Sequence, residues 1–479
     1  MRATNRAVAW LLSCVLLLCS WSGCLVMAAG EQESVETSVS QSQEPVQEVT
    51  PQQMEQAVAG QSMQVLSSRD IVSSGFYLVD SVTGTVLAEK NIHEQRPVAG
   101  LAKMVTALVV LEKGNINETI TISEEAGTRF GRDNRVVDLK PGEEMQVQDL
   151  LYCMLLAPSN EAAYALAEYV GDGSVPQFVE MMNQLAAAAG CQETHFTNPN
   201  GTDEEGQYST PYDMYLLGRY AMANPRYMEI CSAVHKQVPA TNLTDARYFL
   251  TDNRLISPSK EDTYYYSAAR GMASGYTNGA GYCLVTSAQR SNMQLICVVM
   301  GGKVYGEEEL ISSYVDAKNA MVKTFETLQS YSVAKAGDMV KEVAVAAGAM
   351  DHVSLGPQQD VRMLLPADAE AEDVTVEYTL PDLIKAPVKT GDVVGTMKVL
   401  YQGVECGSYA LSALMDVRQS FFGAIGYYLG LFFRNIVVRI LLVLFVLFLI
   451  FYIRLTIVVN HKRQQQLKDN HMRKSRKRY

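Results

Sequence analysis

The chain has 479 residues, of which 48% are hydrophobic and 19% are charged. This length and composition favour two or three folded domains and exclude a disordered or collagen-like chain. The formal net charge is −12, but residues 460–479 hold eight of the 40 basic and one of the 52 acidic residues. The rest of the chain therefore carries a charge of −19, which argues against nucleic acid as a partner, because nucleic-acid binding depends on neutralising phosphates.

The N-terminus has the pattern of a secretory signal peptide. Residues 1–29 begin with basic residues, continue with an apolar stretch and end with small residues, so cleavage is expected after Ala28 or Ala29. The alternative is a lipid-modified Cys24, but Trp21 stands where that signal needs an aliphatic residue. The sequence therefore predicts that the following segment is secreted.

Two folded regions follow a polar linker. Residues 30–68 are rich in Glu, Gln, Ser, Val and Pro and contain no Lys or Arg, which predicts a disordered acidic linker. Over residues 70–330, hairpin-like strands alternate with amphipathic helices and predict an α+β domain. From residue 332 to residue 417, short alternating runs separated by Gly and Pro predict a small all-β, sandwich-like domain.

Start and stop signals give the expected elements of the α+β region. A hairpin is expected over 75–90 and a helix over 100–113, where apolar residues share one face. Caps and prolines then delimit further helices at 149–157, 160–170, 174–190 and from 210, followed by strands at 282–287 and 293–300.

The C-terminal part has the pattern of a membrane anchor. Residues 419–433 are aromatic and amphipathic and predict an interfacial helix. Residues 436–459 are apolar apart from Arg439 and Arg454 and, as a helix rising ~1.5 Å per residue, are long enough to cross a ~30 Å hydrocarbon core. The basic tail 460–479 then predicts a cytoplasmic C-terminus by the positive-inside rule. We expect a single-pass protein of the cell membrane with its bulk outside the cytoplasm.

Six cysteines remain beyond the signal peptide, and none of them has the C-x-x-C spacing of a metal site. The sequence therefore predicts no metal. Cys283 and Cys297 lie on the two arms of the second hairpin, so a disulfide between them is one interpretation. Buried free thiols are the interpretation that we favour.

Four segments of the α+β region carry a family pattern: VDSVTGTVLAEKNIHEQRPVA (79–99), LKPGEEMQVQDLLYCMLLAPSNEAAYALAE (139–168), THFTNPNGTDEEGQYSTPYDM (194–214) and GMASGYTNGAGYCLVTSAQR (271–290). Together they resemble the D-alanyl-D-alanine carboxypeptidases, low-molecular-weight penicillin-binding proteins of peptidase family S11. The resemblance implies a β-lactamase/D,D-peptidase-like (transpeptidase) domain with an antiparallel sheet and flanking helices. The all-β domain resembles the C-terminal domain that these enzymes often carry. The family implies peptidoglycan stem peptides as ligands and no cofactor.

The chemistry of that family needs three short motifs. A Ser-x-x-Lys supplies the nucleophile at a helix start and a lysine that takes its proton. A Ser-x-Asn on a loop between helices shuttles protons and holds the substrate amide. A Lys-Thr-Gly on an edge strand binds the terminal carboxylate of the peptide by charge and hydroxyl.

The first two motifs are degenerate in this chain. The first reads Gly100-Leu101-Ala102-Lys103, so the lysine is present but the nucleophile position is glycine. The second reads Pro158-Ser159-Asn160, so the asparagine stays and the serine is proline. Lys103 and Asn160 are therefore remnants, and each also has a structural interpretation: Lys103 as a cation near a cleft and Asn160 as a helix cap.

The third motif reads Ala273-Ser274-Gly275, in which the lysine is alanine. Ser274 and Gly275 remain as candidate substrate-binding residues, and no catalytic residue set is intact. Two other segments match a motif less well. Ser159 would take the place of the serine of the second motif only if the alignment were shifted by one residue. Residues 389–391 spell Lys-Thr-Gly, the third motif, but they lie inside the all-β domain, where an ordinary strand and turn are expected.

The three lost side chains each supply a different catalytic function, so we expect the scaffold to be retained and the peptidase chemistry to be lost. The sequence predicts a membrane-anchored homologue that acts as a cell-wall binding or scaffold protein. Its expected partners are peptidoglycan stem peptides or cell-wall synthesis proteins. One alternative is an active serine D-Ala-D-Ala carboxypeptidase that trims stem peptides through an unrecognised residue. Another is signalling across the membrane through the basic tail.

Overall fold

In a computed structural model, the protein is described over residues 65–131, 137–258 and 263–475, with side chains to residue 466. The predicted signal peptide 1–29 and most of the predicted linker 30–68 lie outside the described residues, as does the end of the basic tail.

A five-stranded antiparallel sheet forms the centre of the N-terminal domain. Its strands have the order β2-β1-β9-β8-β7, with β1 at Gly75–Asp80, β2 at Val86–Lys90, β7 at Ala269–Thr277, β8 at Gly281–Arg290 and β9 at Met293–Gly302. Strands β8 and β9 carry long runs of buried residues, because helices cover both faces of the sheet. The strand β7 is an edge strand, as the third motif of the family requires.

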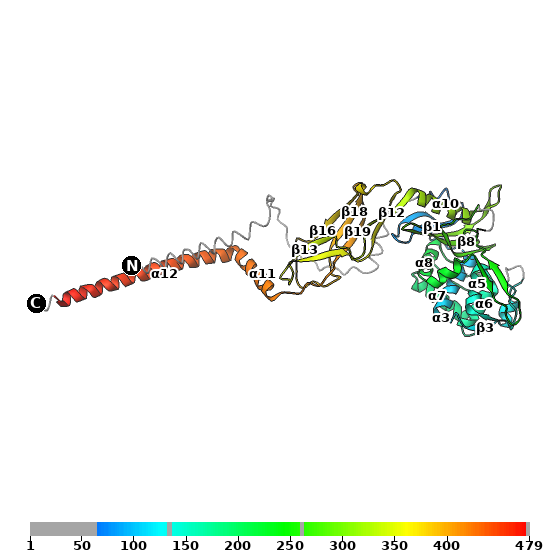
Figure 1. Ribbon diagram of the computed structural model, residues 1–479, viewed down its shortest axis with the longest axis horizontal. Helices are drawn as coiled ribbons and strands as arrows, with labels where there is room; N and C mark the ends of the chain where they lie inside the picture. Colours follow the sequence, from blue (N-terminus) through cyan, green and yellow to red (C-terminus); the bar gives the residue numbers. More distant parts are fainter. Residues whose placement is uncertain (1–64, 132–136, 259–262, 476–479) are drawn as a thin grey trace. The chain divides into compact units, whose positions relative to one another are not determined.

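Helices pack on both faces of this sheet (Figure 1). They are η1 (Ala99–Leu101), α3 (Ala102–Lys113), α4 (Glu124–Thr128), α5 (Val147–Leu156), α6 (Asn160–Val170), α7 (Val175–Ala188), α8 (Pro211–Met222), α9 (Pro225–Cys231) and α10 (Ser312–Thr327). Helix α3 is buried on every side from Ala102 to Val110, which makes it the centre of the larger core. The predicted α+β architecture is confirmed.

The two sides of the sheet belong to different hydrophobic cores. Cys283 contributes to the core around α3, whereas Cys297 contributes to the core against α10. Both thiols are free and fully buried, and burial raises the pKa of Cys283 to about 11. Because side chains on opposite faces of a sheet point apart, the disulfide alternative is wrong and the free-thiol interpretation holds.

The second domain is all β. A six-stranded sheet has the order β16-β18-β19-β14-β13-β17 and a two-stranded sheet pairs β12 with β15 around one apolar core. The strands are β12 (Leu328–Ala334), β13 (Lys341–Ala346), β14 (His352–Pro357), β15 (Val361–Pro366), β16 (Val374–Thr379), β17 (Leu383–Lys385), β18 (Val393–Tyr401) and β19 (Val404–Ala413).

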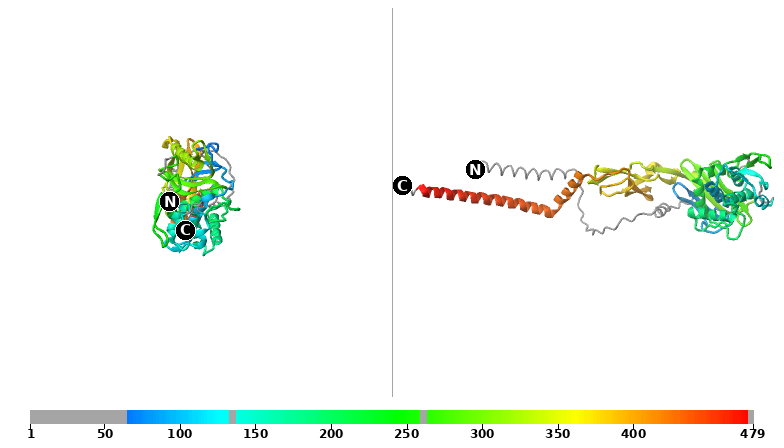
Figure 2. Two further views of the ribbon diagram at one scale, coloured as in Figure 1. Left: turned by 90° about the vertical axis from the view of Figure 1, so that its right-hand side faces the viewer. Right: turned by 90° about the horizontal axis from the view of Figure 1, so that it is seen from below.

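Two helices follow the all-β domain. Helix α11 (Phe421–Arg434) occupies the segment predicted to be interfacial, 419–433. Helix α12 (Ile436–Ser475, red in Figure 2) begins where the predicted membrane span begins. Within the described ranges it is the one helix long and apolar enough to cross a membrane, by length and composition, over Ile436–Gln466. Such a helix can anchor the chain to a membrane.

A buried ion pair joins two of the small two-stranded sheets of the N-terminal domain. These sheets are β3–β4 (Thr119–Thr121, Glu144–Gln146), β5–β6 (His235–Val238, Arg247–Leu250) and β10–β11 (Val304–Tyr305, Leu310–Ile311). Arg247 on β6 binds Glu143 with both guanidinium nitrogens, at 2.7 and 2.9 Å, and the two side chains are 10% and 0% exposed. Burial raises the pKa of the Glu143 carboxyl, but hydrogen bonds from Arg247, the Lys140 backbone and Thr241, together with the charge of Arg247, outweigh it, so the pKa lies below its ordinary value.

Removal of the Arg247 guanidinium should leave the Glu143 carboxylate buried without its charged partner. We expect Arg247→Ala to lower the free energy of unfolding by about 3–5 kcal/mol, the range for breaking a buried pair. The matched control is Arg226→Ala, because Arg226 and its partner Glu229 are 44% and 56% exposed, and it should cost less than about 1 kcal/mol. Denaturant unfolding of the full chain in detergent, followed by circular dichroism, measures both losses, and equal losses would contradict the expectation.

The ion pair also predicts a pH dependence. The folded pKa of Glu143 is lowered, so the stabilisation is fully present above the unfolded pKa of about 4.3 and is lost as the pH falls through the folded pKa. The difference in unfolding free energy between the native chain and Arg247→Ala should therefore be constant near neutral pH and shrink in acid. A difference that grows in acid would show that another group dominates.

Candidate functional site

Gly100, which the sequence predicts to stand at the position of the family nucleophile, lies in the tight turn of η1 that leads into α3. Ala99, just before it, is buried and has a φ of 47°, a left-handed conformation that is rare for a residue with a side chain. Such local strain persists only where surrounding packing imposes it. Gly100 itself is buried, and Lys103 follows as the second residue of α3 with its side chain buried.

The backbone of β7 lies directly against this turn. A Cβ at position 100 would lie 2.6 Å from the carbonyl oxygen of Ser274 and 3.0 Å from the Cα of Gly275. A Cβ at position 275 would in turn meet the backbone nitrogen of Gly100. Gly201 approaches the same turn, with a φ of 84° and no room for a Cβ beside the carbonyl of Ala99. The first and third motifs are therefore adjacent, and backbone fills the space between them.

Helix α9 holds the start of the third motif. The ladder between β7 and β8 shifts register between Gly271 and Ala273, and this irregularity exposes carbonyl groups to α9. Cys231 Sγ donates to the carbonyl oxygen of Gly271 at 2.8 Å, and Tyr227 Oη donates to that of Met272 at 2.8 Å. These two bonds position Ala273.

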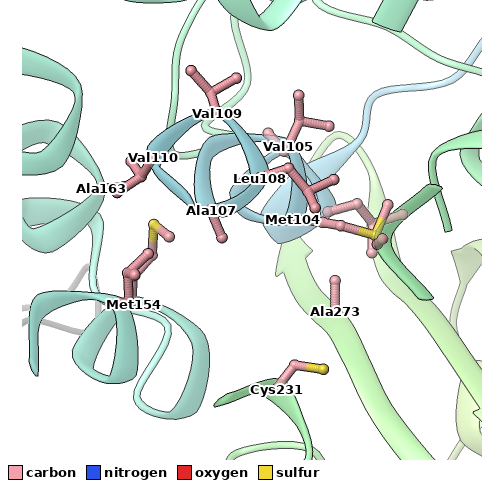
Figure 3. Close-up of a cluster of buried hydrophobic side chains, with 14 of the residues drawn as sticks. Met104, Val105, Ala107, Leu108, Val109, Val110, Met154, Ala163, Cys231 and Ala273 are labelled. Atoms are coloured by element: carbon pink, nitrogen blue, oxygen red, sulfur yellow. The ribbon is translucent and has the colours of Figure 1, made fainter. Parts of the chain in front are cut away.

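The alanine that replaces the motif lysine belongs to an apolar cluster. Figure 3 shows the methyl group of Ala273 directed towards α3, close to Met104, with Cys231 on the other side. All three are buried in the core around α3. A lysine at position 273 would have to leave this cluster or bury its ammonium group in it, which is costly without a partner.

The side chain of Ser274 interacts with helix α10. Burial raises the pKa of Tyr314 on this helix to about 12, and the nearby Ser274 side chain acts in the opposite direction. The Asp252 carboxylate is near enough that its charge also raises the pKa of Tyr314. The structure thus connects the third motif to the segment around Asp252. The substrate-binding role of Ser274 and Gly275 remains a prediction.

The second motif forms the connection between α5 and α6. Ser159 is the N-cap of α6: its buried Oγ accepts from the backbone nitrogen of Ala162 at 3.1 Å and donates to Glu161 Oε2 at 2.9 Å. The capping role that was expected of Asn160 therefore belongs to Ser159, and Asn160 is the first residue of the helix. The Ser159 hydroxyl is thus used in a helix cap and in a bond to Glu161, which disfavours the interpretation that Ser159 takes the place of the loop serine.

The second match to Lys-Thr-Gly is an exposed turn between β17 and β18. Thr390 donates to Asp416 Oδ1 from its backbone nitrogen at 2.8 Å and from its hydroxyl at 2.9 Å. Gly391 has a φ of 93°, which only a glycine adopts readily. The contacts of this segment are those of a turn, in agreement with the interpretation from the sequence.

A hollow of about 710 Å³ lies beside the second motif, at Pro158. Strand β6 forms one wall of it with Tyr248 and Leu250, and Asp138 and Asp252 also line it. The sequence did not predict the hairpin β5–β6, because each strand has only four residues, too few for alternation to be detected.

Comparisons with known proteins identify the family of the two folded domains. The family described as D-alanyl-D-alanine carboxypeptidase (peptidase S11) matches residues 60–304, and the C-terminal domain of penicillin-binding protein 5 matches residues 328–419. D-alanyl-D-alanine carboxypeptidase DacF of Bacillus subtilis is 30% identical over 354 residues, which is 72% of this chain and 86% of that protein. DacA of Haemophilus influenzae is 31% identical over 377 residues, covering 76% of this chain and 90% of the relative.

Solved structures give the same result. Penicillin-binding protein 5 from Haemophilus influenzae has a TM-score of 0.64 and 29% identity, over 74% of this chain and all of that one. Penicillin-binding protein 6B from Escherichia coli, at 24% identity and a TM-score of 0.57, shares the fold. The predicted transpeptidase-like fold with a C-terminal all-β domain is thus confirmed, and the chain belongs to the D-alanyl-D-alanine carboxypeptidase family, peptidase S11.

Proposed function

We propose that this protein is a membrane-anchored member of the family that forms no acyl-enzyme and acts by binding cell-wall peptides or cell-wall synthesis proteins. The observation that carries the proposal is the packing at position 100. A nucleophile there needs a side chain, and the nearest backbone atom, the carbonyl oxygen of Ser274, lies 2.6 Å from where its first carbon would be.

The chemistry of acylation supports the same conclusion. The family mechanism needs a nucleophile, a group that takes its proton and a group that holds the peptide carboxylate. Lys103 and Asn160 survive, but a proton acceptor and an amide have nothing to activate when the attacking hydroxyl is missing. Ala273 supplies no charge for a carboxylate. Each change removes a separate requirement, so restoring one of them does not restore the reaction.

The ends of the chain give the proposed location. Residues 1–29 have the pattern of a secretory signal peptide, and helix α12 has the length and composition of a membrane span. The basic residues that follow the span favour a cytoplasmic C-terminus. Both folded domains would then face the cell wall, where peptidoglycan stem peptides occur.

The second candidate function is an active serine-type D-Ala-D-Ala carboxypeptidase that trims stem peptides. The similarity to DacF and DacA, proteins named as carboxypeptidases, favours it. It requires a nucleophile other than residue 100, and penicillin would mark that residue by forming a stable adduct with it.

The first test is the intact mass of the purified full chain after incubation with excess penicillin. We expect an unchanged mass and no release of D-alanine from a stem pentapeptide, because position 100 has no nucleophile. The purified DacA relative, treated in the same way, is the positive control. A covalent adduct or D-alanine release would contradict the proposal, and peptide mapping of the adduct would identify the nucleophile of the second candidate function.

A second test restores the hydroxyl. We expect Gly100→Ser to remain unlabelled by penicillin and to lose about 1–3 kcal/mol of unfolding free energy, because the new side chain overpacks the contact with β7. Gly131→Ser is the matched control, since a Cβ there meets no atom of the described residues within 4 Å. Labelling of Gly100→Ser at full stability would show that the cleft is open and lacks only the hydroxyl.

The anchor can be tested by extraction. Membranes that contain the full chain, washed with sodium carbonate, should retain it, because a spanning helix is not removed with peripheral proteins. A chain that ends before residue 436 keeps only the interfacial helix and should be released by the same wash. Release of the full chain would contradict a spanning role for α12.

A further inference from the structure

Helix α11 presents an apolar groove on one of its faces. The groove has a volume of about 420 Å³, and its lining residues recur every three or four positions, which is the spacing of one helix face: Phe421, Ala424, Ile425, Tyr428, Leu429 and Phe432. Five of these six side chains are 42% to 74% exposed. A continuous exposed apolar surface of this kind marks a place where another molecule binds.

The all-β domain adds a cation to this groove. Lys385, the last residue of β17, donates from Nζ to Tyr428 Oη at 2.7 Å, and its ammonium group lies 5.2 Å from the centre of the tyrosine ring. This bond uses one of the three ammonium protons, and the phenol keeps its own proton to donate. An ammonium group and a phenol O–H held together suit an anion with several oxygen acceptors, such as a phosphate. Because Tyr428 also lines the groove, the charged group and the apolar surface are adjacent.

The all-β domain also holds the first turn of α11. The backbone nitrogen of Ser420, the N-cap of α11, donates to the carbonyl oxygen of Ala347 at 2.9 Å. Gly423 lies so close to the same turn of the all-β domain that a Cβ there would be 3.1 Å from the carbonyl oxygen of Gly348. The hydrogen bond from β17 is a third contact, further along the helix. The three contacts together keep the groove beside the lysine.

The other end of α11 leads directly into the candidate membrane span. Asn435 separates the two helices, and its Oδ1 accepts from the backbone nitrogen of Val437 in the first turn of α12, at 2.9 Å. Arg439 of α12 donates from Nε to the carbonyl oxygen of Phe433, at 2.8 Å. With α12 in a bilayer, these bonds keep the end of α11 at the level of the lipid headgroups, where phosphate groups and acyl chains are both within reach.

We propose that this groove binds an anionic phospholipid of the membrane, with the phosphate at Lys385 and Tyr428 and an acyl chain against the apolar side chains. The lysine complements the charge of the phosphate, and the acyl chain removes the apolar face from water. The lipid then fastens the all-β domain to the bilayer at a point other than the span. This inference depends on the membrane location proposed above and is independent of the loss of acylation.

The test measures lipid binding to the full chain in detergent by native mass spectrometry. The probes are dioleoyl phosphatidylglycerol and dioleoyl phosphatidylcholine, which have the same acyl chains and differ in net charge. We expect phosphatidylglycerol to bind about fivefold tighter, the contribution of one basic residue near an anionic lipid surface. Lys385→Gln should remove this preference. The matched control is Lys389→Gln, which removes an exposed lysine of the same domain outside the groove and should keep the preference.

A second pair of variants tests the apolar part of the site. Leu429→Gln places a polar group in the groove and should weaken the binding of both lipids about tenfold, because a buried leucine contact is lost. Leu431→Gln is the matched control, since Leu431 lies on the same helix outside the groove and the two leucines are 46% and 49% exposed. The control should bind both lipids as the native chain does.

The outcomes separate this inference from the proposed function. Equal binding of the two lipids by the native chain, or loss of the preference in Lys389→Gln as well, would overturn the headgroup site. A dimer that Leu429→Gln dissociates would show that a second copy of the chain covers the groove, and would overturn the lipid site. Release of the full chain by sodium carbonate would contradict the anchor itself, whereas retention together with equal lipid binding would contradict this inference alone.

Discussion

The contact between the backbone of β7 and the turn before α3 determines what the candidate site can do. Gly100 and Gly275 lie against each other there, and neither position has room for a Cβ. Two backbones approach this closely only where side chains are absent. Once formed, the contact occupies the volume that a nucleophile would need. The sheet and helix α3 keep the fold of the family, and backbone atoms fill the space beside position 100.

The side chains around the other motif positions are well packed and hydrogen-bonded. A buried polar group without a hydrogen-bond partner lowers the stability of a protein by about 1–3 kcal/mol. A site that had lost one side chain and nothing else would contain such groups. Here the Ser159 hydroxyl both accepts and donates as the cap of α6. Tyr227 and Cys231 each reach a carbonyl group of β7, and Ala273 completes an apolar cluster. A lysine placed at position 273 would therefore meet an apolar, filled surrounding.

Local patterns allowed much of the fold and the motif positions to be predicted. Caps and prolines define helices such as α7 and α8, and uninterrupted sequence around 150–163 fixes the register of the second motif. Tertiary features could not be predicted in this way. The contact of Gly100 with Gly275 depends on how β7 docks, and Arg247 lies 104 residues from Glu143. The side of the sheet that each cysteine occupies follows from the strand register, which the hairpin alone does not determine.

The charges around the three motif positions are a feature separate from the packing at Gly100. A lysine at position 273 would attract a carboxylate, but alanine stands there, and the guanidinium that lines the hollow is neutralised by Glu143. In the proposed function, the packing at Gly100 bears on whether a covalent bond can form. The alanine at position 273 bears on whether a peptide carboxylate can be held by charge. The two changes act on different steps of the family chemistry, so either of them alone would weaken it.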